Sequence, residues 1–247
     1  MSKIFPSMHS KPEKYTFVGT LIYWPFVFLF FPIYMPYLGM GLWNDIELGP
    51  WLDIGYHVVN GIVLLILLWG YLKEEWFMVS TDFRFYLKHI ALTVGLMIGV
   101  TALRVGTPFL CGFDVDYMLN GLPVVEMTVN FTPWYLLGLK PVIGTIVISV
   151  FSSISVCALF YCFSFANFCY RRPWLGYVSI VVITLIPALI DIIWRGEGAL
   201  VLSAYIVRLP IHLLACWSYQ KTDNVWTPLV SLMATNLLLS AVMLVLY

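Results

Sequence analysis

Repeated long apolar segments are the feature that most limits what this chain can fold into. A helix needs about twenty largely apolar residues to cross a hydrocarbon core of about 30 Å. Seven such stretches recur along the 247 residues, and they run approximately over 15–37, 54–72, 89–110, 141–170, 174–194, 199–219 and 226–247. Only 11% of the residues are charged, whereas an ordinary soluble domain carries about 25%. The sequence therefore predicts an all-α, polytopic transmembrane helical bundle, with residues 1–247 forming one integral membrane domain in the lipid bilayer.

One long connection separates the third apolar stretch from the fourth. Residues 112–140 mix the acids Asp114, Asp116 and Glu126 with aromatic residues and a short apolar run. We expect an external cap or a re-entrant segment here. If part of it crosses the bilayer, the bundle has eight spans.

The distribution of basic residues predicts the orientation, because Lys and Arg are retained on the cytoplasmic side of a membrane. One set of alternate loops holds Lys3, Lys11, Lys14, Lys73, Arg84, Lys88, Arg171, Arg172 and Lys221. The opposite set holds Lys140 and Arg195. We therefore expect a cytoplasmic N-terminus and an external C-terminus. The formal net charge is +0, and no nucleic-acid partner is predicted.

Four ionisable side chains fall inside the predicted spans. They are Arg104, Asp191, Arg208 and His212. A charged group at the bilayer centre costs at least about 2.5 to 3.5 kcal/mol, so each is a candidate for a functional site. Arg208 and His212 are four residues apart on one helical face, and the four groups together are predicted to line a polar cavity. The alternative for Arg104 and Asp191, near span ends, is that they reach the headgroups.

Smaller polar groups in the spans have a structural interpretation. Asn60, Asn236 and the serines at 152, 153 and 155 are expected to form hydrogen bonds between helices. Glu74 and Glu75 stand beside Lys73, and we interpret them as part of a solvated loop. The sequence contains no His-Glu-x-x-His run, phosphate-binding glycine loop or Gly-x-Ser-x-Gly elbow.

The stretch 219–236, YQKTDNVWTPLVSLMATN, resembles the last signature of the CPBP family of intramembrane proteins, which includes CAAX proteases and bacteriocin-processing (Abi) proteins. That signature reads approximately Tyr-x-Arg/Lys-Thr-Gly-x-x-Trp-x-Pro-x-x-x-His-x-x-x-Asn. The residues in register are Tyr219, Lys221, Thr222, Trp226, Pro228 and Asn236. Leu232 stands at the position of the histidine.

Two earlier motifs of the family are degenerate here. Glu-Glu-x-x-x-Arg falls on ANFCYR, so Ala166 and Asn167 replace the glutamates and only Arg171 is kept. Phe-x-x-x-His falls on Pro187 to Asp191, which places Asp191 at the histidine position. The resemblance implies the family's helical core, but a mechanism in which glutamate activates water cannot operate with these residues.

These observations leave three functions open. The preferred hypothesis is a non-proteolytic CPBP-like protein of the bacterial cytoplasmic membrane that binds a membrane-protein or peptide partner and needs no cofactor. The first alternative is a divergent metal-dependent protease that uses zinc with Asp191, His212, Asn236 and Glu126. The second is a small transporter or lipid-binding protein whose intramembrane arginines and histidine engage an anionic group.

Overall fold

A computed structural model describes residues 49–110, 139–169, 172–195 and 198–246, and every element in these ranges is helical. This confirms the all-α prediction. The elements are α4 (Gly49–Thr81), α5 (Phe83–Leu110), α8 (Leu139–Val156), the π-helix η3 (Cys157–Phe165), α9 (Ala166–Cys169), α10 (Pro173–Arg195), α11 (Gly198–Thr222) and α12 (Trp226–Leu246). The predicted span 15–37 and residues 112–138 of the long connection lie outside the described residues.

Two helical segments among the described residues are long and apolar enough to cross a membrane, namely Ile54–Thr81 and Phe83–Leu103. Shorter apolar stretches occur over Ile146–Val156, Pro173–Leu185 and Trp226–Val242. Helix α4 continues well beyond the end predicted for its span at residue 72, because its buried face extends to Val79. The seven-span arrangement therefore remains a prediction.

Local sequence explains where several helices begin and end. Asp82 caps α5, since its carboxylate accepts a hydrogen bond from the Phe85 backbone N–H at 3.4 Å. Pro173 opens α10, where a missing N–H costs nothing. At α12, Asn224 Oδ1 accepts a bond from the Trp226 N–H at 3.0 Å. Helix α11 ends because Asp223 adopts a left-handed φ of 48°.

The left-handed conformation of Asp223 can be tested by two substitutions. Asp223→Gly and Asp223→Ala both remove the carboxylate, but only glycine adopts a positive φ without a steric penalty. We expect Asp223→Gly to be more stable than Asp223→Ala by about 1 kcal/mol. Thermal unfolding of both variants in one detergent measures the difference, and equal stabilities would contradict it.

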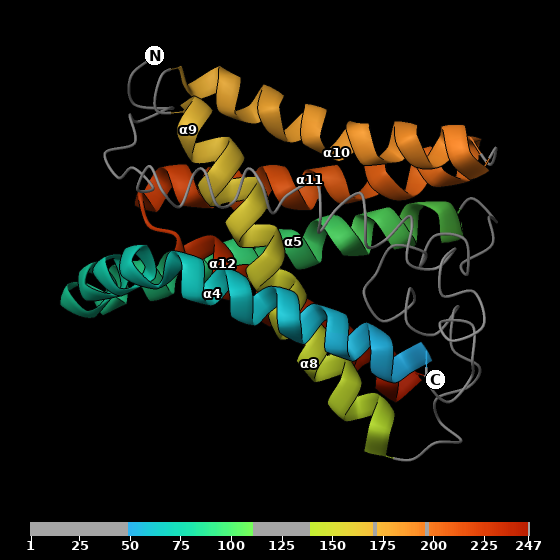
Figure 1. Ribbon diagram of the computed structural model, residues 1–247, viewed down its shortest axis with the longest axis horizontal. Coiled ribbons are helices and arrows are strands. Elements are labelled where there is room, and N and C mark those ends of the chain that lie inside the picture. The colour runs from blue at the N-terminus through green and yellow to red at the C-terminus, as the bar shows by residue number, and fades with distance from the viewer. Residues whose placement is uncertain (1–48, 111–138, 170–171, 196–197, 247) are drawn as a thin grey trace.

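Helices α10 and α11 run side by side, and the continuous helix α8–η3–α9 crosses them obliquely (Figure 1). Helix α4 packs on α8, while α12 packs against both α5 and α8. The α4–α5 turn, the α9–α10 junction and the α11–α12 loop gather at one end of the bundle (Figure 1). Arg84, Arg172 and Lys221 stand at or next to the helix ends that meet there, and Lys73 and Lys88 lie farther along α4 and α5. The fold thus brings together basic residues that the predicted topology assigns to one side.

The interior contains many small polar side chains that join helices. Thr93 Oγ1 donates to Ser218 Oγ at 2.9 Å, and Ser164 Oγ donates to Ser179 Oγ at 2.9 Å. Asn236 Nδ2 donates to Ser153 Oγ at 3.0 Å, which confirms the predicted interhelical role of this pair. Large apolar side chains stand on the outside, including Trp69, Ile66 and Leu103. This distribution is typical of helices that pack inside lipid.

Candidate functional site

The π-helix η3 lies at the centre of the core. Its backbone follows an i to i+5 pattern at its end, where the Ala166 N–H bonds to the Tyr161 carbonyl. Such segments often occur at functional sites because the extra residue per turn redirects side chains. Tyr161, Cys162 and Phe165 of η3 are at most 1% exposed. They pack in one cluster with residues of α4, α10, α11 and α12.

A polar contact joins η3 to α11. The Tyr161 hydroxyl lies 3.0 Å from His212 Nδ1, and their rings are tilted toward one another. Arg208 is half-buried one turn earlier on α11 and close enough to act on His212 electrostatically. Two members of the predicted polar cavity thus lie in the same region of α11. The side chains of the other two, Arg104 and Asp191, lie outside the described residues, so the cavity itself stays a prediction.

Two of the positions to which the sequence resemblance assigns CPBP motif residues, Ala166 and Leu232, are occupied by packing residues. Ala166 is 1% exposed and Leu232 is 4% exposed, and both belong to the hydrophobic core. Asn236 is engaged with Ser153. Asn167 lies on α9, but its side chain is not described. Arg171 and Glu126 are not among the described residues.

Of the four residues that the protease alternative names, His212 and Asn236 have described side chains, whereas Glu126 and the side chain of Asp191 lie outside the description. Zinc sites use three or four His, Cys, Asp or Glu ligands that converge on one point. No group of three such residues is found among the described side chains. Ala166 and Leu232 have no atom that could coordinate a metal.

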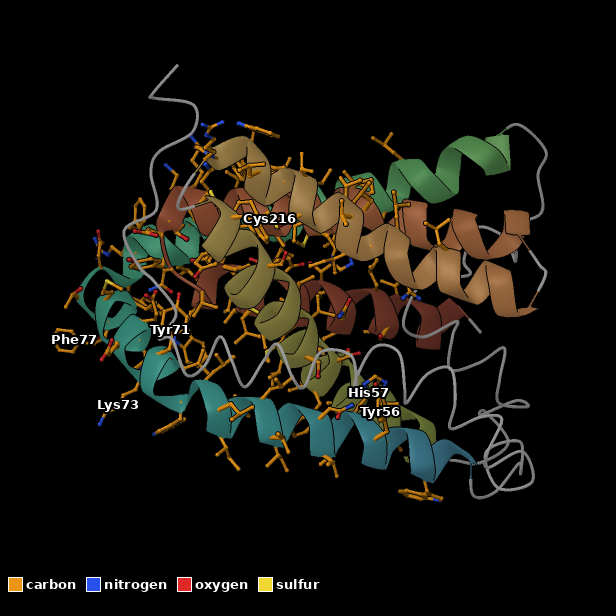
Figure 2. The ribbon with its side chains drawn as sticks, turned by 45° about the horizontal axis from the view of Figure 1, so that its top comes forward. Tyr56, His57, Tyr71, Lys73, Phe77 and Cys216 are labelled. Carbon is orange, nitrogen blue, oxygen red and sulfur yellow. The ribbon has the colours of Figure 1, made fainter. Side chains whose placement is uncertain are left out.

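A second polar centre lies where α4 meets α11. The hydroxyls of Tyr71 and Tyr219 form a buried hydrogen bond across these two helices. Figure 2 shows Tyr71 directed into the bundle, while Lys73 and Phe77 of the same helix point away from it. One turn after Tyr71, Glu75 is only 2% exposed. Its interpretation as part of a solvated loop is wrong, because α4 continues through it and turns it inward.

The α11–α12 connection, residues 222–226, is anchored on α4, and we call it the latch. Asn224 Nδ2 donates to the Glu75 backbone carbonyl at 2.8 Å. Trp226 Nε1 donates to the Leu72 carbonyl at 2.8 Å, and its ring meets Trp76 edge-on at 5.0 Å between centroids. The latch therefore satisfies backbone carbonyls of α4 and closes over the side chain of Glu75.

A pattern in the sequence could have revealed the burial of Glu75. The buried positions of α4 include Asn60, Leu64, Leu68, Tyr71, Leu72, Glu75 and Val79. They recur every three or four residues, as one face of a helix does. The acid pair attracts attention as a charged loop, but Glu75 continues this buried face and Glu74 does not.

A groove of about 550 Å³ opens on the surface between α5, α10 and α11. It is lined by Val100, Tyr177, Pro210, Leu213, Leu214 and Trp217. Its walls are almost entirely apolar, and neither Arg208 nor His212 contributes to them. Such a surface favours an apolar ligand over an ion or a polar substrate.

No family model, curated protein or solved structure matches this chain.

Proposed function

We propose that this chain is an integral membrane protein with a CPBP-like bundle that does not cleave peptides and instead holds a membrane-protein or peptide partner. The observation that carries the proposal is the role of the motif positions. Ala166 and Leu232 fill the core, and Asn236 joins α12 to α8. Alanine and leucine neither bind a metal nor accept a proton, so these positions support helix packing instead of water activation.

The proposal includes seven spans in a bacterial cytoplasmic membrane, with the N-terminus in the cytoplasm and the C-terminus outside. Its support is the two helical segments long enough to cross, together with the basic residues that the fold collects at one end. Placing that end in the cytoplasm agrees with the preference of Lys and Arg for this side.

Photo-crosslinking in cells tests the partner role. A photoreactive amino acid replaces Trp217, which lines the groove, and in a second variant it replaces Ile66, an exposed residue of α4. We expect an adduct of one defined protein mass from position 217 and none from position 66. The groove encloses a partner segment between three helices, whereas Ile66 stands with Ile62 and Trp69 on the exposed outer face of α4 alone.

Other outcomes would reverse the proposal. Adducts with lipid alone at both positions would favour the lipid-binding alternative. Stoichiometric zinc in the purified chain, with peptide cleavage that is lost in Asp191→Asn, would establish the divergent protease.

A further inference from the structure

The carboxyl group of Glu75 is buried, and only one of its two oxygens has a hydrogen-bond partner among the described residues. Glu75 is 2% exposed, and its Oε2 has no hydrogen-bond partner among the described residues. The carboxyl group receives a hydrogen bond from the Val225 backbone N–H in the latch. A buried carboxyl oxygen without a donor is unusual in folded proteins and needs an explanation.

Among the residues that the structure describes, no positively charged side chain acts on this group. The titratable side chains that act on it are Glu74 on α4, Tyr86 on α5, Cys162 on η3, Tyr219 on α11 and Asp223 in the latch. Each of these is neutral or acidic. An ionised Glu75 would therefore be a buried anion beside other acids, without the paired cation that such a group requires.

The surrounding oxygens are already engaged, which argues against a metal ion as the missing partner. The carbonyls of Leu72 and Glu75 accept bonds from Trp226 and Asn224. The hydroxyls of Tyr71 and Tyr219 bond to each other. A hard metal cation needs about six oxygen ligands, whereas a proton needs only one.

We propose that Glu75 is a proton-binding site whose neutral acid form holds the latch, residues 222–226, against α4. Loss of the proton from Oε2 places a buried anion next to Asp223. Repulsion and the need for water then separate the latch from α4 and break the bonds of Asn224 and Trp226 to its carbonyls. Because the latch joins α11 to α12, the bound proton controls how these helices are held on α4.

Thermal unfolding of the full chain in detergent tests this proposal from about pH 6 to about pH 9. The samples are the wild type, Glu75→Gln and the matched control Glu74→Gln, whose site is an exposed neighbour on the same helix. The protonated form of Glu75 is the one that stabilises the fold. Its contribution to the free energy of unfolding is therefore present at low pH and is lost as the pH rises. Between about pH 6 and about pH 9, the unfolding temperatures of the wild type and of Glu74→Gln should each fall by about 5 °C more than that of Glu75→Gln.

Hydrogen exchange of the latch supplies a second measurement. After correction for the intrinsic effect of pH, the latch amides should exchange faster at high pH in the wild type and Glu74→Gln but not in Glu75→Gln. Parallel pH curves for all three proteins would overturn the proposal. If Glu75→Gln does not fold, a wild-type unfolding temperature and latch exchange that are both independent of pH would still overturn it.

A sodium series separates a proton from a metal ion. At fixed pH, sodium chloride replaces choline chloride at equal ionic strength. The proposal expects no sodium-specific change in unfolding temperature. A sodium-dependent rise that is absent in Glu75→Gln would identify a metal cation as the ligand and overturn the proton assignment.

Discussion

Replacing Tyr219 with alanine is expected to lower the free energy of unfolding by about 3 to 5 kcal/mol. Tyr219 is fully buried where α11 meets α4 and η3, and its ring lies near that of Phe165. The substitution leaves a cavity of aromatic size and removes the hydroxyl partner of Tyr71. Chemical unfolding in detergent micelles, followed by tryptophan fluorescence, measures the loss.

Two further variants separate the contributions to this effect. Tyr219→Phe keeps the ring and removes the hydroxyl, so its expected cost is about 1 to 3 kcal/mol. Phe77→Ala removes an aromatic ring that is 70% exposed, and it should change stability by less than about 0.5 kcal/mol. A Tyr219→Ala protein as stable as Phe77→Ala would show that Tyr219 is not part of a packed core.

Gly176→Ala is expected to destabilise the protein by about 1 to 3 kcal/mol. A Cβ atom at this position would lie 2.8 Å from the Cys169 Cβ and 2.9 Å from the Phe165 ring. Phe165 is 0% exposed and has no space into which to move. Helix α10 must therefore shift away from η3 and α9, and thermal unfolding in detergent detects the resulting loss of packing.

Gly99→Ala on α5 is the matched control. Nothing lies within 4 Å of the added Cβ, and alanine is the better helix former. This variant should be as stable as the wild type or more stable by up to about 1 kcal/mol. If Gly176→Ala is as stable as Gly99→Ala, α10 does not pack against η3 as closely as the structure shows.

The helices themselves follow from the sequence to a large extent. Apolar stretches of helical length predict helices within the ranges that α4, α5, α10, α11 and α12 occupy, although α4 extends beyond both ends of its predicted stretch. The break between the predicted spans 199–219 and 226–247 agrees with the end of α11 at Thr222 and the start of α12 at Trp226. These features are predictable because helix hydrogen bonds and turn conformations depend on residues close together in the chain.

The candidate site was predicted less completely. His212 was selected as a buried polar group, and the structure gives it Tyr161 as a partner 3.0 Å away. The π-helical stretch that presents Tyr161 was not predicted, because its pattern of apolar residues does not differ from that of an ordinary buried helix. Glu75 was assigned to a loop because its neighbours Lys73 and Glu74 are charged and exposed.

By itself, the sequence determined that the described part of the chain is all helical and that its long apolar segments suit lipid, since both properties belong to single segments. Only the tertiary structure decided which polar side chains face one another. The contact between Asn224 and Glu75 joins residues 149 positions apart, and the one between Tyr71 and Tyr219 joins residues 148 apart. Such contacts depend on how separate helices pack together. The sequence of either helix alone therefore does not specify them.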